Sequence, residues 1–354
     1  MRERIHRYYQ TVLLLIMAAV LLTACSSDGS DAQTISTGDA SKDHVVHLVS
    51  YASGYMEAAT TRSAPSGYSD YLPDKAVVMG VYVLPENYNA LEEQLIKYDG
   101  AKWHATFSVD KNKNYAVYGY LPKAAGMSSS LTKSAPDAAT LTLTGMKPIT
   151  TDDICIITGV KETNVGLKEG QFSWYTPVGV DTYYINILMD HLYAAVMFSM
   201  KIDTDYANLR TIKLKKMELS TNKESVKATI SLKHNTTGAS PVTGVTYTPS
   251  GSSYTAEIFS SEEGTALDKK TPLVINSCFA PTLSNNLTLV TTYDVYDSKD
   301  NLIRQNCTAT NKLPNLEAVR AQRVQVNMTV NPTYLYVLSE PDLDNPTIKL
   351  KIDN

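Results

Sequence analysis

Apolar and polar residues alternate in short runs through most of the chain, which is the pattern of strands with one buried face. Residues 103–109, 226–232 and 324–330 alternate cleanly, while 44–51 and 77–84 are apolar on both sides and predict fully buried strands. The pattern predicts an all-β chain, and further strands are expected at 115–121, 141–144, 154–158, 182–188, 196–202, 212–219, 287–296, 302–308, 334–338 and 348–352.

Three segments depart from this simple pattern. The apolar positions of 212–219 change parity at Lys215–Lys216, as one inserted residue would cause, so we predict a β-bulge there. Residues 88–98 predict a short helix. Residues 236–271, rich in Ser, Thr, Gly and Pro, predict mostly loop.

Two polar turns predict β-hairpins. The turn at Asp110–Lys113 would join the strands at 103–109 and 115–121. The turn at Asp297–Asn301 would join the strands at 287–296 and 302–308. This second turn lacks the central glycine and closing glutamate of a calcium-binding EF-hand, so it is expected to be only a hairpin tip.

The spacing of short strands predicts two tandem β-sandwich domains, Greek-key-like and transthyretin-like. We place them at 44–189 and 190–354, after a polar, flexible tether at 25–43. The terminal strand, 333–352, ends with the alternating aliphatic residues Ile348, Leu350 and Ile352. Such a segment must pair, either with its own sheet or with another molecule.

The first residues have the layout of a secretory signal peptide, 1–24. A basic start precedes the apolar run 12–22, which is far shorter than the roughly 20 residues that span a membrane. The closing Leu22-Thr23-Ala24-Cys25 resembles a bacterial lipobox. Acylation of Cys25 would anchor the chain in a membrane. Plain secretion is the alternative.

The composition agrees with an exported β protein. The 354 residues carry a formal net charge of -4, which gives no basic field for nucleic acid. Charged residues make up 19%, and 23 Tyr stand against 5 Phe, a choice that favours strands. Besides Cys25, the odd number of cysteines (Cys155, Cys278 and Cys307) implies no disulfide framework. Cys155 is expected to be a small buried residue, and a bridge between Cys278 and Cys307 is not expected.

No recognisable catalytic motif occurs, so we expect no enzyme, no cofactor and no metal. His44 and His47 are three residues apart on a predicted strand and would point to opposite faces. His104 and His191 are interpreted as structural. Two rival functions remain open: a surface glycan-binding lipoprotein that does not polymerise, and a glycoside hydrolase, which would need two carboxylates in one cleft.

The chain resembles the fimbrillin family of the type V pilin superfamily, which are surface lipoproteins. The residues that carry the resemblance are the lipobox, the Thr61-Arg62-Ser63 step after the first strand, the segment from Trp103 through 115–120, Asp190–Val196, and Val330–Tyr334. The likeness covers most of the chain.

The resemblance implies a fimbrial subunit or adhesin on the outer membrane, exported as a lipidated precursor and bound to other pilin subunits, of its own or a related kind. Host or bacterial surface ligands are further partners that it suggests. An arginine-specific protease would cut between Arg62 and Ser63 and remove the first strand, although Arg62 fits an ordinary loop residue equally well. A neighbour's terminal strand would fill the groove; its inserting residues would be Tyr334, Tyr336, Leu338, Ile348, Leu350 and Ile352.

Overall fold

The computed structural model describes residues 45–53, 56–57, 68–70, 78–85, 92–98, 103–104, 113–161, 182–234, 241–283, 286–314, 316, 319–335 and 340–353. These residues are strands and connections, with two short 3₁₀ helices, η1 (Tyr206–Asn208) and η2 (Pro281–Leu283), so the all-β prediction is confirmed. Within them, no helix is long and apolar enough to cross a membrane. The predicted leader, Cys25, Arg62 and Ser63 lie outside the described residues.

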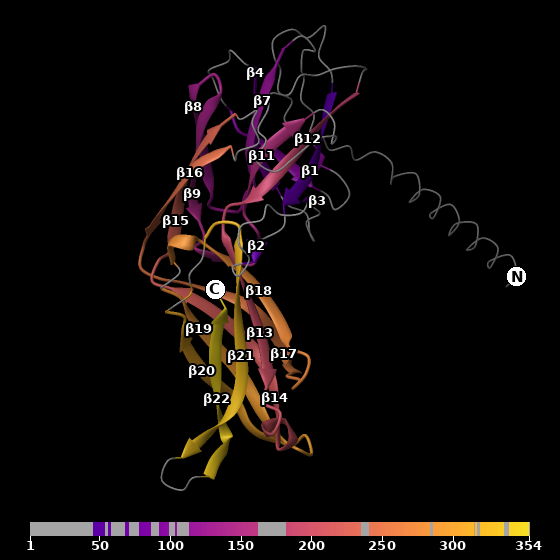
Figure 1. The fold of residues 1–354 in the computed structure, drawn as a ribbon, viewed down its shortest axis with the longest axis vertical. Coiled ribbons are helices and arrows are strands. Elements are labelled where there is room, and N and C mark those ends of the chain that lie inside the picture. Colours follow the sequence, from indigo (N-terminus) through magenta and orange to yellow (C-terminus); the bar gives the residue numbers. More distant parts are fainter. Residues whose placement is uncertain are drawn as a thin grey trace, which may run out of the picture. The chain divides into compact units, whose positions relative to one another are not determined.

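The described strands form four sheets (Figure 1). Sheet 1 has the order β3 (Tyr68–Asp70), β1 (Val45–Ser53), β12 (Thr182–His191), β11 (Cys155–Lys161), β7 (Tyr115–Leu121), β4 (Val78–Pro85), β5 (Gln94–Tyr98), β6 (Trp103–His104). Sheet 2 has the order β16 (Val242–Ser250), β15 (Ser225–Lys233), β9 (Ala138–Met146), β8 (Ser128–Ala135). Sheet 3 has the order β10 (Ile149–Thr150), β18 (Leu273–Phe279), β13 (Ala194–Ile202), β21 (Gln322–Leu335), β2 (Met56–Glu57), and β22 (Glu340–Asp353) also pairs with β21. Sheet 4 has the order β17 (Tyr254–Ala266), β14 (Arg210–Thr221), β19 (Thr288–Asp297), β20 (Leu302–Lys312).

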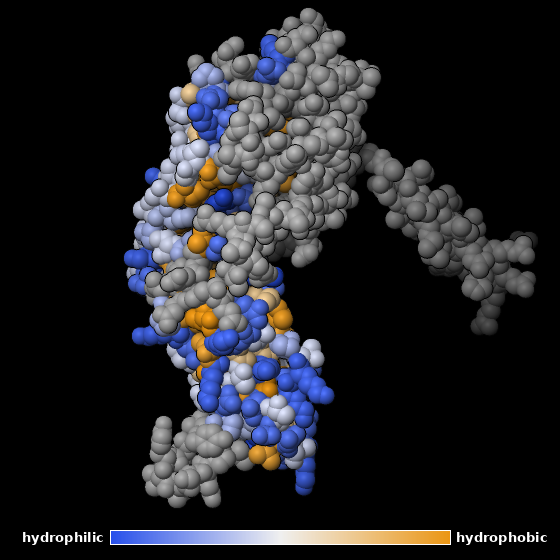
Figure 2. Space-filling model, in the orientation of Figure 1, coloured by the Kyte–Doolittle hydropathy of each residue, from blue (hydrophilic) through white to orange (hydrophobic). Residues whose placement is uncertain are grey.

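The burial of side chains follows the alternation in the sequence. In β15, Val226, Ala228, Ile230 and Leu232 are buried and the residues between them are not. β7 is buried along its whole length and is apolar on both faces; β4 pairs along one of its edges, and β11 pairs with its last two residues. On the face drawn in Figure 2, apolar residues of the described part lie in small patches among hydrophilic ones.

The predicted bulge in β14 is confirmed. Leu214 pairs with Tyr293 and Lys216 with Thr292. These two partners are consecutive in β19, so Lys215 is the one extra residue of the bulge. The ladder with β17 is also shifted at this point. Because the bulge resets the alternation, apolar residues on both sides of it face the same core.

The second predicted hairpin is confirmed as β19–β20. Asp297 closes its turn: one carboxylate oxygen accepts hydrogen bonds from the main-chain N–H groups of Lys299 and Asn301, each 2.8 Å long. Most of the first predicted hairpin, including its turn, lies outside the described residues. At its described end the prediction is wrong, because β6 pairs with β5 while Leu121, at the end of β7, pairs with Cys155 of β11. The sequence marked a turn there but not the neighbours of the strands that flank it.

Two local predictions are wrong for a common reason, which is that long-range pairing overrides local preference. Residues 94–98 form β5, not a helix, and burial alternates from Gln94 to Lys97 because one face covers the core beside β4. The segment predicted as loop contains β16 and β17. Their many Thr and Ser residues occupy exposed strand positions, which hydroxyl side chains tolerate.

The chain passes between sheets near residue 190 and then returns. β12 in sheet 1 is followed directly by β13 in sheet 3. β15 and β16 come later in the sequence but join β9 in sheet 2. The two-domain division at residue 190 stays a prediction, since this pairing joins strands from both sides of that residue.

Candidate functional site

The first strand lies inside sheet 1, between β3 and β12 (Figure 1). β1 runs parallel to β12 through eight registered pairs, from Val45 opposite Thr182 to Ala52 opposite Met189. The prediction that this strand is not an edge strand is therefore confirmed. Residues 185–191 of β12 are all buried, so β1 covers the main-chain edge of a deeply embedded strand.

The short strand β2 follows β1 in the chain but joins sheet 3. Met56 pairs with Gln322 and Glu57 with Arg323, in parallel, at the start of β21. The segment before Arg62 therefore contributes strands to two sheets.

The terminal strand β22 pairs antiparallel with β21, with Val330 opposite Ile348 and Met328 opposite Leu350. Ile348 is buried, and Leu350 and Ile352 are partly buried against the core, whereas the lysines between them are exposed. The alternation predicted for this strand is confirmed. The prediction of one terminal strand at 333–352 is wrong, because residues 333–335 continue β21 and pair antiparallel with the start of β22. Of the other candidate donor residues, Tyr334 therefore lies in β21 opposite Pro341, and Tyr336 and Leu338 lie outside the described residues.

Two side chains of sheet 4 hold the main chain of β22. The Tyr293 hydroxyl donates a hydrogen bond to the carbonyl oxygen of Pro346, 3.1 Å away. Nδ2 of Asn311 donates to the carbonyl oxygen of Ile348, 3.3 Å away. Sequence reasoning missed both residues. The one available signal was general: a buried tyrosine hydroxyl usually needs a polar partner.

The passage from β12 to β13 is buried and densely hydrogen-bonded. Asp190 accepts a hydrogen bond from the His191 N–H and forms an ion pair with Arg320, which also donates to the His191 carbonyl oxygen. The Tyr193 hydroxyl donates to the carbonyl oxygen of Lys147, 2.8 Å away. The Tyr247 hydroxyl donates to the Leu192 carbonyl oxygen, so a strand of sheet 2 holds the passage from sheet 1 to sheet 3.

His191 also contacts the side chains of Asp153, just before β11, and of Cys155, the first residue of β11. Its Nδ1 lies 2.6 Å from Oδ2 of Asp153 and 3.8 Å from Sγ of Cys155. Cys155 is fully buried, as expected from the sequence, and burial, followed by the charges of Asp153 and Asp190, raises the pKa of its thiol. Among the described cysteines, Cys155, Cys278 and Cys307 form no disulfide, which agrees with the expectation for the last two.

A second polar cluster lies around Glu93, beside β7. Its carboxylate accepts hydrogen bonds from Tyr120, from Ser129 at 2.6 Å and from Lys123 at 2.9 Å. Burial alone would raise the pKa of Glu93, but these three donors outweigh it, so the pKa lies below its ordinary value. Gly80 makes room for the cluster, because a Cβ there would lie 2.5 Å from the Glu93 carboxylate and 2.6 Å from the Tyr120 ring.

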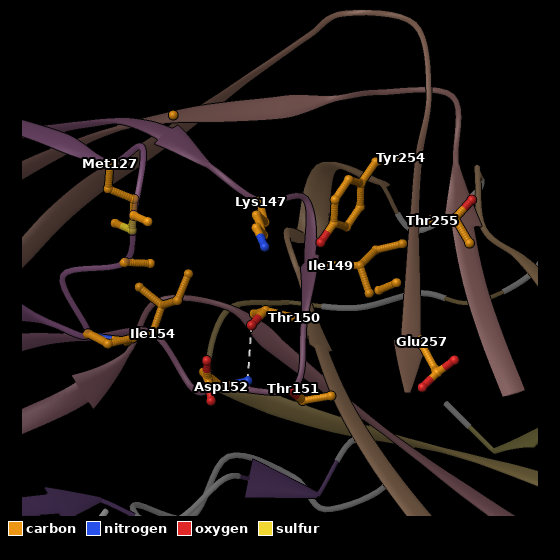
Figure 3. A pocket seen from close by; sticks show the side chains of 15 residues that line it. Met127, Lys147, Ile149, Thr150, Thr151, Asp152, Ile154, Tyr254, Thr255 and Glu257 are labelled. Carbon is orange, nitrogen blue, oxygen red and sulfur yellow. Dashed lines mark hydrogen bonds between the residues drawn. The ribbon is translucent and has the colours of Figure 1, made fainter. Parts of the chain in front are cut away.

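A hollow of about 320 Å³ lies between the segment 147–154 and the start of β17 (Figure 3). Met127, Ile149 and Ile154 give it an apolar wall, and Tyr254 and Glu257 of β17 also line it. Asp152 lies on its wall and is held by a 3.0 Å hydrogen bond from its N–H to the Thr150 hydroxyl. Asp153, the next residue, instead contacts His191.

Comparison with protein-family models and with curated proteins gave no match. Among solved structures, the chain is similar to a candidate cell adhesion protein of Bacteroides uniformis (TM-score 0.41, 9% identity, 89% of this chain and 98% of that chain). It is similar to a second candidate cell adhesion protein, of Bacteroides fragilis (TM-score 0.43, 12% identity, 88% of this chain and 97% of that chain). It is also similar to a fimbrial protein of Bacteroides vulgatus (TM-score 0.35, 12% identity, 88% of this chain and 99% of that chain).

Proposed function

We propose that the chain is a structural subunit of a cell-surface fimbria, or a fimbrial adhesin, whose subunits are joined by exchanged strands. In this proposal two tandem β-sandwich domains follow a lipoprotein leader, and Cys25 carries the lipid that anchors the precursor in the outer membrane. The work of the protein is adhesion and assembly, not catalysis.

One observation carries the proposal, namely the position of β22. It is the last strand of the chain, and it pairs with β21 along one edge only among the described strands. Its inward aliphatic residues pack on the core and side chains of sheet 4 hold its main chain. A terminal segment that is held by one strand edge and a few side-chain contacts could leave its own chain and add to a free strand edge of a neighbouring chain.

The position of β1 and β2 supports the first step of the proposed strand exchange, which is their removal by proteolysis. A cut after Arg62 would separate both strands from the rest of the chain. It would free the edge of β12, opposite eight residues of β1, and the start of β21, opposite two residues of β2. An uncovered edge beside buried apolar residues is a template for pairing with another chain. The terminal segment 333–352 of a second subunit, which includes most of β22, would then leave its own chain and take the place of β1.

Limited digestion of the purified chain with an arginine-specific protease tests this proposal. We expect a new N-terminus at Ser63, followed by conversion of monomer into ladders of oligomers on size-exclusion chromatography. Arg62→Ala should block both steps, and Arg304→Ala, at an exposed position of β20, should block neither. A chain that is cut at Arg62 and stays monomeric would contradict the proposal, as would a chain that assembles without being cut.

A further inference from the structure

Strand register brings three potential metal ligands together at the end of sheet 1. Cys155 and His191 are direct partners across the β11–β12 ladder, and Asp153 precedes Cys155 by two residues. A 2.6 Å hydrogen bond from the N–H of Leu192 to the carbonyl oxygen of Ile154 joins the two segments beside this pair. The three side chains therefore meet because of the fold, although Asp153 and His191 are 38 residues apart.

The ligand atoms are close enough to share one ion. The carboxylate oxygen of Asp153, the thiol sulfur of Cys155 and the ring nitrogen of His191 all lie within 4.8 Å of one another. Bond lengths of about 2.3 Å to sulfur and about 2.05 Å to nitrogen place these two ligands about 3.6 Å apart in a tetrahedral site. The observed separation between Sγ of Cys155 and Nδ1 of His191 is 3.8 Å.

The arrangement does not fit nucleophilic catalysis. In a catalytic triad the nucleophile and the acid contact opposite nitrogens of the histidine ring. Here Asp153 and Cys155 both approach Nδ1. An ion bound by all three side chains would take the place of the hydrogen that now lies between Asp153 and His191. The Asp153 oxygen would have to move away from Nδ1 of His191, since nitrogen and oxygen ligands of a tetrahedral ion lie about 3.3 Å apart.

We propose that Asp153, Cys155 and His191 bind one divalent metal ion of the zinc class. Thiolate, imidazole and carboxylate together are a ligand set for Zn²⁺ or Co²⁺ and not for Ca²⁺ or Mg²⁺, which take oxygen ligands. Water would fill the fourth position. Two hydrogen bonds hold the main chain of His191 in place. Its N–H donates to Asp190, and its carbonyl oxygen accepts from Arg320.

Charge and access agree with this assignment. The carboxylate of Asp153 lies 2.6 Å from Nδ1 of His191 and so places negative charge where a cation would bind. The Asp153 side chain is 21% exposed and the His191 side chain 6%, so an ion would enter from the side of Asp153. Bound there, it would join β11 to β12, the strand that pairs with β1.

Titration of the reduced full-length chain with Co²⁺, which reports its ligands by absorption, tests the site. We expect one ion per chain, thiolate-to-cobalt charge-transfer absorption, displacement by Zn²⁺ and a higher melting temperature. Cys155→Ser should abolish the charge-transfer band, and Cys307→Ser, on a different sheet, should keep it. Asp153→Asn should weaken binding by at least the roughly 10–100-fold typical of changes around a metal ligand. Asp152→Asn, its neighbour on the wall of the hollow, should leave binding unchanged.

Circular dichroism of each variant without metal shows whether it folds. Asp153→Asn keeps the size of a partly exposed side chain, so this variant tests the site even if Cys155→Ser unfolds the chain. The proposal is overturned if the folded wild-type chain binds no Co²⁺ or Zn²⁺. It is equally overturned if Asp153→Asn and Asp152→Asn bind the ion alike, since the hydrogen bond between Asp153 and His191 would then be purely structural.

Discussion

The hydroxyl of Tyr293 in β19 donates a hydrogen bond to the main-chain carbonyl oxygen of Pro346 in β22, 3.1 Å away and shielded from solvent. The contact connects sheet 4 to the terminal strand of sheet 3. A buried carbonyl oxygen that loses its partner costs about 1–3 kcal/mol. This bond therefore helps to keep the terminal strand on its own chain.

Replacing Tyr293 by Phe should lower the free energy of unfolding by about 1–3 kcal/mol, because the Pro346 carbonyl oxygen is left without its donor. Amide hydrogen exchange in β22 should accelerate more than in β15, which lies in sheet 2. Tyr296→Phe is the control, since Tyr296 is on the same strand and only partly buried. Equal effects of the two substitutions on β22 would show that the Tyr293 hydroxyl does not hold the strand.

Alkaline pH should destabilise the chain through its buried tyrosines. Burial, with a smaller contribution from Cys307, raises the pKa of Tyr293 from 10.0 to about 12, and burial also raises the pKa of Tyr118 and Tyr247. Above pH 10 the unfolded chain loses phenolic protons that the folded chain keeps. The stability that these tyrosines contribute is therefore fully present below pH 10.0 and is lost as pH rises towards about 12.

Urea unfolding at a series of pH values from about 8 to about 12 measures this loss. The range covers both the ordinary tyrosine pKa of 10.0 and the raised pKa of Tyr293, about 12. In Tyr293→Phe the decline should be shallower by about one bound proton. An unfolding free energy that stays constant over this range would mean that the tyrosines titrate alike in the folded and unfolded chains.

Deleting Lys215 should leave a folded protein. Lys215 is the extra residue of the bulge, so its removal keeps Leu214 and Lys216 opposite consecutive residues of β19 and keeps the apolar residues facing inward. Deleting Lys227 from the regular strand β15 should instead turn one part of that strand over, which exposes buried aliphatic residues. Thermal melting should show a modest shift for the first deletion and no cooperative transition for the second; the reverse order would contradict the register.

Gly80→Ala should destabilise the chain by about 1–3 kcal/mol, because the added methyl group overlaps the Glu93 carboxylate and the Tyr120 ring. Gly244→Ala is a matched control in another strand, since its Cβ would meet no atom within 4 Å. The control should be neutral or stabilising, by up to about 1 kcal/mol. Chemical denaturation of both variants measures the difference, and equal stabilities would exclude the close approach at Gly80.

Side-chain parity was readable in the sequence, but the choice of strand partners was not. The change of parity at Lys215 located the bulge, and the polar turn after Asp297 located a hairpin. The residues around Glu93 favour a helix locally, and pairing of β5 with β4 overrides that preference. No local pattern could have shown that β15 pairs with β9.

The same limit applies to the candidate sites. The aliphatic residues of the last strand were identified because their alternation is local. The partners that hold this strand, Tyr293 and Asn311, come from another sheet and carry no signal of their own. Cys155 was correctly expected to be buried, but its contact with His191 follows from the register of β11 and β12, which the sequence does not show.

Locking β22 onto its own chain is the most direct test of the strand-exchange account. Met328 and Leu350 are opposite each other in the β21–β22 ladder, at a spacing that suits a disulfide, so the pair M328C and L350C should close one. A matched lock, T291C with A309C, joins β19 to β20 and leaves β22 untouched. After digestion with the arginine-specific protease, size-exclusion chromatography should find the oxidised β21–β22 lock monomeric. The same variant after reduction, and the matched lock in both states, should be polymeric. Normal polymers from the oxidised β21–β22 lock would contradict the account.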